Sequence, residues 1–338
     1  MMKKKIAIIL LCIFIGVSGI IVPKMLNEYK KSVAEKTTVY IPLDATYSQM
    51  LDSLKKALAD IASFDKVAQK ASLPNNFKAG RYILTPDKSN KDIVRILQNG
   101  WESPMMLTLS GNIRSLEKLS GILGRRLAAD SAAFMEYFKM PEVWEENGFA
   151  KETFMAMFIP NTYEVYWTIT PQKFVQRMKK EYDKFWNGER KAKAKEIGLS
   201  ELEVSILASI VCEETNYTPE MPRVAGVYMN RLKRGMKLDA DPTVKFALGD
   251  PTVKRILFRH LKIDSPYNTY LYAGLPPGPI TIPGIKGIDA VLNYENHNYL
   301  YFCANSNMDG THKFAGTLSE HNRNARAYQA ALNRLKIR

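Results

Sequence analysis

The stretch SILASIVCEETNYTPEMPRVAGVYMNRLKRGMKLDADPTVKFALGDPTV, residues 205–253, carries the most information about this chain. An apolar helical pattern leads into two adjacent carboxylates, Glu213 and Glu214, and a second, basic helical pattern follows. Burial disfavours a charged carboxylate, so one that ends an apolar helix face needs a reason to be there. Acid and base chemistry on a glycosidic bond would supply that reason.

The phase of the first predicted helix distinguishes the two glutamates. Ser200 and Glu203 form a capping-box pattern at its start. At about 100° per residue, Glu214 projects into the apolar arc, Glu213 lies near its edge and Cys212 points away. The arc consists of Leu202, Ile206, Leu207, Ile210 and Val211. Desolvation and the negative end of the helix dipole would both raise the pKa of Glu214, which makes it the candidate general acid.

Two aspartates are the candidate partners if the chemistry uses a pair of carboxylates. Asp239 and Asp241 lie in the segment LDADPTV, downstream of the second helix. Asp241 precedes Pro242, and an aspartate in that position is also a common turn former. The residues alone therefore leave two interpretations open for this region, a catalytic site or a solvated helix end followed by a turn.

The composition limits the classes of protein that fit. With 338 residues, 46% of them hydrophobic, the chain can form one large domain or two ordinary ones. The net charge of +14 favours polyanions such as nucleic acid, anionic lipid or an acidic cell-wall polymer. Nucleic acid is not expected, because no run of Lys and Arg is interleaved with aromatic residues. Three cysteines are too few for a disulfide framework, and pairing of Cys212 with Cys303 is left open.

The N-terminus has the pattern of a signal anchor. Lys3, Lys4 and Lys5 precede the apolar run IAIILLCIFIGVSGIIVP, residues 6–23, and no typical cleavage site follows it. We expect a cytoplasmic tail at 1–5, a transmembrane anchor at 6–23 and a linker at 24–37. Basic residues flank the run on both sides, so the orientation rests on the short tail, which favours a body outside the cytoplasm.

The remaining pattern predicts an α+β protein. Strands at 38–43 and 80–85, a helix at 48–61 and a helix capped by Ser89 and closed by Gly100 indicate a small α/β module at 38–102. Residues 103–338 predict a mixed α+β domain. Its expected elements are a strand at 107–110, helices at 113–127, 174–195, 200–214, 222–234, 288–292 and 319–335, a turn-rich loop at 265–284 and a strand at 299–304.

Several standard catalytic motifs are missing from the sequence. It contains no G-x-S-x-G elbow, phosphate-binding loop, G-x-G-x-x-G or H-E-x-x-H. The four histidines have no ligand-like spacing, so neither a metal nor a cofactor is expected. The aromatic segment FIPNTYEVYW, residues 158–167, fits either core packing or a sugar-stacking rim.

Blocks spread along the chain resemble the endolytic murein transglycosylases, the MltG (YceG-like) family. They are FKAGRYILTPDKSNKDIVRILQNG (77–100), FIPNTYEVYW (158–167), ASIVCEET (208–215), RVAGVYMNRLKRGMKLDADPTVKFAL (223–248), SPYNTYLYAGLPPGPITIPG (265–284) and YLYF (299–302), followed by His312 and His321. The resemblance covers nearly the whole chain after the predicted anchor, in order.

This resemblance implies a single-pass protein of the bacterial inner membrane, with an extracytoplasmic (periplasmic) body made of a LysM-like module and a catalytic domain. The implied reaction cleaves the β-1,4 bond between N-acetylmuramic acid and N-acetylglucosamine in nascent glycan strands, leaves 1,6-anhydro ends and terminates strand elongation. The implied partners are peptidoglycan, the plasma membrane and, as a candidate, synthases of the penicillin-binding protein class. Two alternatives remain: a muramidase that pairs Glu214 with Asp239 or Asp241, and a non-catalytic peptidoglycan-binding anchor protein.

The resemblance also implies site residues. The family's catalytic glutamate precedes threonine in an E-K-E-T-like motif, which corresponds to Glu214 before Thr215. Cys212 stands in place of the first glutamate of that motif, and Glu213 in place of its lysine. Asp239 stands where glutamine is frequent. The candidate substrate-binding residues are Asn230, Asp239, Tyr267, Asn268 and Tyr270, and each has an equally good structural interpretation.

Overall fold

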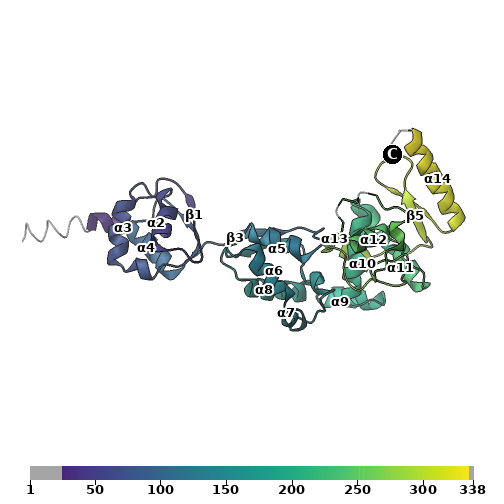
Figure 1. The fold of residues 1–338 in the computed structure, drawn as a ribbon, viewed down its shortest axis with the longest axis horizontal. Coiled ribbons are helices and arrows are strands. Elements are labelled where there is room, and N and C mark those ends of the chain that lie inside the picture. The colour runs from purple at the N-terminus through teal and green to yellow at the C-terminus, as the bar shows by residue number, and fades with distance from the viewer. Residues whose placement is uncertain (1–24, 251, 254, 335–338) are drawn as a thin grey trace, which may run out of the picture. The chain divides into compact units, whose positions relative to one another are not determined.

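The structure is a computed structural model that describes residues 25–250, 252–253 and 255–334 (Figure 1). The chain divides into two compact units. The first comprises residues 25–107 together with 126–129 and 164–169, and the second comprises the other described residues. The predicted anchor at 6–23 lies outside the described residues. In the part of the chain that is described, no helix is both long and apolar enough to cross a membrane.

The first unit is built around a two-stranded antiparallel sheet. Strand β1 (Thr37–Ile41) pairs with β2 (Gly80–Leu84), and Val39 lies opposite Tyr82. Three helices pack with these strands: α2 (Tyr47–Lys55), α3 (Ile61–Lys70) and α4 (Asn90–Asn99) (Figure 1). Alternate residues of both strands are buried, so one face of the sheet contributes to the unit's own hydrophobic core.

Local signals explain where these helices begin and end. Ser89 and Asp92 form the capping box that starts α4, and Gly100 ends it in the left-handed region at φ 65°. The single helix expected at 48–61 is wrong: α2 ends at Lys55, and Asp60 caps a separate helix α3 by accepting from the backbone N of Ser63. A 3₁₀ turn, η1 (Leu73–Asn75), follows α3.

The second unit begins with a group of helices around buried phenylalanines. These elements are α5 (Leu116–Gly124), α6 (Ser131–Lys139), α7 (Pro141–Glu145), η2 (Phe154–Met157), α8 (Pro171–Phe185) and α9 (Gly188–Glu196). Phe158 stacks on Phe174 with ring centroids 6.2 Å apart, and both are fully buried. The continuous helix expected at 174–195 is wrong, because buried Trp186 ends α8 and Asn187 caps α9.

The segment FIPNTYEVYW serves mainly as core. Strand β4 (Asn161–Val165) pairs with β3 (Met105–Leu109), and Phe158 and Tyr163 are buried. Tyr166 is exposed, whereas Trp167 packs edge-on against Tyr40 within the first unit, with centroids 5.1 Å apart. Core packing is therefore the correct interpretation for the two buried rings.

Helix α10 (Glu201–Glu214) lies at the centre of the remaining helices, α11 (Met221–Lys233), α12 (Asp241–Leu248) and α13 (Ile285–Leu292) (Figure 1). The sequence predicts burial on one side of this helix only. That prediction is incomplete, because every residue from Val204 to Cys212 is buried. The close approach of α13 explains the burial of Cys212: a Cβ on Gly287 would lie 2.2 Å from its Sγ. The capping box of Ser200 and Glu203 is present as predicted.

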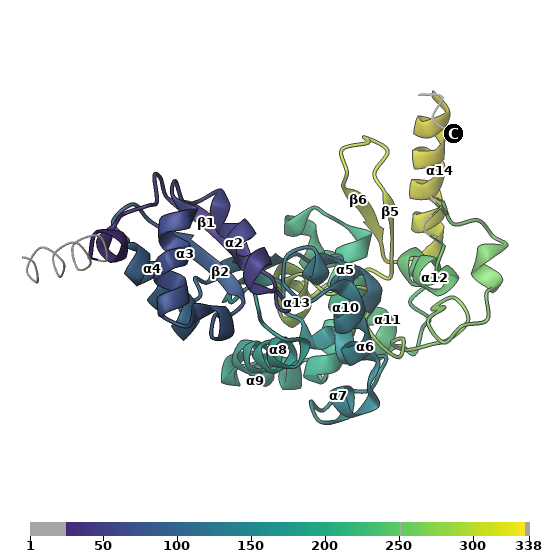
Figure 2. The same cartoon turned by 60° about the vertical axis from the view of Figure 1, so that its left-hand side comes forward.

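The C-terminal part adds a hairpin and a helix. The strand expected at 299–304 is present as β5 (Tyr301–Ala304). It pairs antiparallel with β6 (His312–Ala315), a strand that was not predicted, and both contact α14 (Leu318–Arg334) (Figure 2). Residues 265–284 form an irregular loop, as expected. The short turns η3 (Thr218–Glu220) and η4 (His260–Lys262) complete the unit.

Candidate active site

Glu214 is the last residue of α10 and lies where two cavities meet. Thr215, in an extended conformation, ends the helix. Glu214 is partly exposed and lines a cavity of about 420 Å³ and another of about 980 Å³. Asp241, at the first position of α12, also lines both cavities. The helix that buries the stem of Glu214 therefore leaves its carboxyl group accessible from two directions.

Tyr228 of α11 binds the carboxyl group of Glu214 directly. Its hydroxyl donates a hydrogen bond of 2.6 Å to Glu214 Oε1. The ring is 2% exposed and packs edge-on against Phe302 of β5, with centroids 5.8 Å apart. Tyr228 thus occupies one carboxyl oxygen and leaves Oε2 to carry a transferable proton.

The environment of Glu214 keeps it protonated at a higher pH than an ordinary glutamate. Burial raises its pKa from 4.5 to about 7, and the negative charges of Asp241 and Glu213 act in the same direction. The hydrogen bond from Tyr228 opposes this shift by stabilising the carboxylate. A group with a pKa near neutrality can both donate and accept a proton at that pH.

Glu213 points to a different partner. Its side chain is 10% exposed and pairs with Arg114, whose Nη2 contacts Oε2 and whose Nε lies 3.3 Å from Oε1. Both residues line the larger cavity. Cys212 is a free, buried thiol whose pKa is raised by burial, and Cys303 is also free. Neither Glu213 nor Cys212 is placed to replace Glu214.

The two aspartates have separate anchors. Asp239 adopts φ 51° in the left-handed region, and its Oδ2 pairs with Arg231 Nη1 at 2.7 Å. Asp241 accepts a hydrogen bond of 2.7 Å from the hydroxyl of Tyr270. All four residues line the smaller cavity. Among the predicted substrate-binding residues, Asp239 and Tyr270 therefore lie in the same cavity as Glu214.

The other three predicted binding residues are engaged elsewhere. The Asn230 amide donates to the carbonyl oxygens of His297 and Tyr299. Asn268 is fully buried and donates to the carbonyl oxygens of Leu261, in η4, and of Ile263, just after it. Tyr267 packs on Phe246, which lines the larger cavity, with centroids 4.7 Å apart. The two asparagine side chains thus hold the backbone around the site.

Sequence reasoning did not single out Tyr228, Arg231 or the pair of Glu220 with His312 as site residues, although all but Glu220 line the smaller cavity. Tyr228 was predicted only to face inward. The signal that could have identified His312 was its place in a block of family resemblance. Within the described ranges, no group of His, Cys, Asp and Glu side chains is arranged to hold a metal ion.

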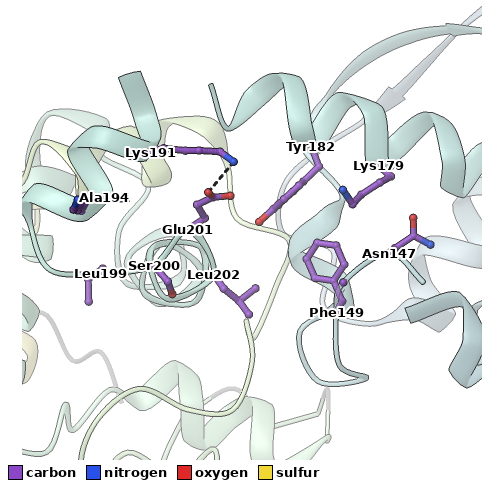
Figure 3. Close-up of a pocket in the computed structure, with 12 residues that line it drawn as sticks. Asn147, Phe149, Lys179, Tyr182, Lys191, Ala194, Leu199, Ser200, Glu201 and Leu202 are labelled. Carbon is purple, nitrogen blue, oxygen red and sulfur yellow. Dashed lines mark ion pairs between the residues drawn. The ribbon is translucent and has the colours of Figure 1, made fainter. Parts of the chain in front are cut away.

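A third cavity, of about 500 Å³, lies at the opposite end of α10 (Figure 3). Figure 3 shows Lys191 pairing with Glu201, at 3.1 Å, near Tyr182 and Phe149. With a rise of 1.5 Å per residue, the 14 residues of α10 separate this cavity from Glu214 by roughly 20 Å. None of the predicted site residues lines it, so Glu214 and its two cavities form the candidate active site.

The comparisons with known proteins give the family of this chain. The sequence profile of the YceG-like family matches residues 39–327. The chain belongs to the YceG-like family. The match includes most of the first unit's sheet, the segment around Glu214 and the β5–β6 hairpin.

Named relatives of this YceG-like chain come from Bacillus subtilis and Streptococcus pneumoniae. An endolytic murein transglycosylase of Bacillus subtilis (strain 168) is 42% identical over 127 residues, which are 38% of this chain and 34% of that protein. One of Streptococcus pneumoniae serotype 2 is 27% identical over 320 residues, or 85% of this chain and 57% of that protein. The chain spans about a third of the length of the first curated relative and just over half of the length of the second.

A solved structure also resembles this YceG-like chain. The crystal structure of a yceG-like protein from Listeria monocytogenes superposes with a TM-score of 0.57 at 28% identity. The superposition covers 86% of this chain and 98% of the Listeria chain. The fold therefore recurs over almost the whole of that protein.

Proposed function

We propose that this protein is a peptidoglycan lytic transglycosylase in which Glu214 is the only general acid and base. It would cleave the β-1,4 bond between N-acetylmuramic acid and N-acetylglucosamine in nascent glycan strands and so terminate their elongation. The observation that carries the proposal is a glutamate with a pKa of about 7 where two cavities meet. The names of the two relatives support the choice of substrate.

In the first step Glu214 acts as an acid. Because Tyr228 donates to Oε1, the proton of the neutral carboxyl group lies on Oε2. Transfer of this proton to the glycosidic oxygen accompanies cleavage of the bond between that oxygen and C1 of the muramic residue. N-acetylglucosamine leaves with a free hydroxyl, and positive charge develops at the muramic C1.

In the second step the same group acts as a base. The Glu214 carboxylate, stabilised by Tyr228, accepts the proton of the muramic C6 hydroxyl as its oxygen attacks C1. The new bond between O6 and C1 closes the 1,6-anhydro ring, and Glu214 regains its proton. No water is consumed, so the product is one water lighter than a hydrolysis product.

The surroundings of Glu214 suit an internal bond of a polymer. Cavities on both sides of the carboxyl group give room for sugars before and after the cleaved bond. The larger cavity has the basic side chains Lys118, Lys245 and Arg255. These cations would attract the acidic groups of peptidoglycan stem peptides.

The domain organisation belongs to the same proposal. Residues 6–23 would anchor the chain in the plasma membrane after a tail at 1–5 and before a linker at 24–37, with the body outside the cytoplasm. Residues 38–102 would act as a LysM-like module that binds glycan, supported by the hydrophobic core that the first unit has of its own. Residues 103–338 would form the catalytic domain, and synthases of the penicillin-binding protein class are the candidate protein partners.

Digestion of purified sacculi by the full chain tests the proposed chemistry. We expect muropeptides with the mass of 1,6-anhydro ends. Because one group serves both steps, Glu214→Gln should lower the rate by about 10⁴ or more, the upper end for loss of a general acid or base. Glu213→Gln is the matched control, because it changes the neighbouring carboxylate and should leave most of the activity. Ends one water heavier would show a muramidase that pairs Glu214 with Asp241 or Asp239. Binding to sacculi without any product would show an anchor protein.

A further inference from the structure

The smaller cavity beside Glu214 contains a histidine that is held by a buried carboxylate. Glu220 ends η3, shortly after Glu214, and its side chain is 6% exposed. His312 opens strand β6, and its side chain is 14% exposed. Glu220 Oε1 accepts from the backbone N of His312 at 2.9 Å, and Oε2 contacts His312 Nδ1 at 2.7 Å. Both carboxylate oxygens thus hold the same residue.

This contact determines what His312 presents to the cavity. Because a carboxylate only accepts hydrogen bonds, the proton of a neutral His312 imidazole lies on Nδ1, and Nε2 is then an acceptor. His312 lines the cavity together with Glu214 and Tyr270. Nε2 has no hydrogen-bond partner among the residues that the structure describes. In that form His312 offers an oriented acceptor at the cavity that it lines.

The hairpin that bears His312 is held in place by other contacts as well. Arg231 Nε donates to the carbonyl of Leu300 at 2.6 Å, and Tyr228 packs against Phe302. A buried carboxylate is costly to desolvate, so a link that only had to hold the hairpin would not require one. Fixing the tautomer and the ring orientation of a histidine does require a hydrogen-bond acceptor at Nδ1.

We propose that His312 is a sugar-recognition residue, whose Nε2 accepts a hydrogen bond from a hydroxyl group of the glycan strand. This inference rests on the proposed function and adds a binding contact to it. Tyr301 and Phe302 of β5 line the same cavity and supply aromatic surface for a pyranose ring. Because Glu220 already fixes the imidazole, little side-chain ordering is lost when the sugar binds.

Two substitutions of His312 separate recognition from structure. His312→Asn keeps a donor near the position of Nδ1 and removes the acceptor at Nε2. We expect it to unfold like the parent chain, and its KM for glycan oligomers to rise about three- to tenfold with little change in kcat. His312→Gln can place an acceptor near Nε2 but leaves Glu220 without its side-chain partner, so we expect a smaller rise in KM and a lower unfolding midpoint.

A third substitution changes the tautomer of His312 without replacing the residue. In Glu220→Gln the amide can donate to Nδ1, which moves the imidazole proton to Nε2 and removes the acceptor from the cavity. The KM should therefore rise as in His312→Asn. A parental KM in both variants, or a loss confined to kcat, would overturn the inference.

Binding measurements keep this test independent of turnover. Calorimetry with oligomers of N-acetylglucosamine and N-acetylmuramic acid compares the full chain carrying Glu214→Gln with the same chain carrying His312→Asn as well. Weaker binding in the double variant supports recognition, and equal binding refutes it while the proposed chemistry stands. If oligomers bind but the parent chain forms no anhydro ends, the proposed chemistry fails and this comparison still decides the role of His312. If the chain binds no oligomer, both proposals fail.

Discussion

Replacing Tyr228 with phenylalanine tests the origin of the acidity of Glu214. The substitution removes one hydroxyl, which donates 2.6 Å to Glu214 Oε1, and keeps the ring that packs against Phe302. That hydrogen bond favours the carboxylate over the neutral acid. Removing the hydrogen bond must therefore raise the pKa of Glu214, because this bond opposes the upward shift that burial causes.

The size of the shift follows from the strength of the contact. A hydrogen bond to a charged group contributes about 1.5–3 kcal/mol, and one pKa unit corresponds to about 1.36 kcal/mol. The pKa of Glu214 should then rise by about 1–2 units from its value of about 7. Burial and the carboxylate of Glu214 raise the pKa of Tyr228 well above its usual range, so its hydroxyl remains a donor throughout the pH range of interest.

The assay is the pH dependence of kcat/KM for release of anhydro-ended products. Glu214 must be protonated to start the reaction, so activity falls as the pH rises through its pKa in the free enzyme. The midpoint of this fall should move from near pH 7 to about pH 8–9 in Tyr228→Phe.

Tyr270→Phe is the matched control. It removes an equivalent hydroxyl that donates to Asp241 instead, so its midpoint should move much less. An unchanged midpoint in Tyr228→Phe, or one at lower pH, would refute the assigned role of Tyr228.

Three further outcomes are expected. Glu214→Gln should stabilise the fold above pH 7 by up to about 3 kcal/mol and have little effect below pH 4.5, as measured by denaturant midpoints at pH 8 and pH 4. The folded chain binds the Glu214 proton more tightly than the unfolded chain, so the stability of the parent chain falls as the pH rises between these values. Glu213→Gln should move the fall in kcat/KM to lower pH, because it removes a negative charge that raises the pKa of Glu214; a move to higher pH would contradict this. Gly287→Ala should lower the free energy of unfolding by about 1–3 kcal/mol, because its Cβ would overlap the Sγ of Cys212. In a double-mutant cycle, adding Cys212→Ala should restore much of that stability.

The capped starts of some helices and the candidate acid could be predicted because their signals are local. A cap needs only a side chain and the backbone three residues on, so Ser89 and Ser200 start their helices as the sequence indicates. Gly235 likewise has φ 63° just after α11. The helical phase directed attention to Glu214, and the geometry gives it the raised pKa that the pattern suggested.

The partners of these residues could not be predicted, because they come from distant parts of the chain. Glu213 pairs with Arg114 across 99 positions, and Glu220 with His312 across 92. Such contacts depend on how helices and strands pack, which a periodic pattern does not encode. The burial of Cys212 shows the same limit: phase placed it opposite the apolar arc, but α13 covers that side of α10 as well.

The packing around α10 connects acidity with recognition. Tyr228 contacts Glu214 through its hydroxyl and Phe302 through its ring, and Phe302 in turn packs edge-on against His312 with centroids 5.2 Å apart. Glu220, which orients His312, lies in the turn that follows Glu214. The acid and the proposed recognition residue are thus fixed by one connecting segment and one line of aromatic rings. A sugar that binds at His312 would be positioned relative to the Glu214 proton by rigid packing, and a shift of the β5–β6 hairpin would change binding without removing the acid.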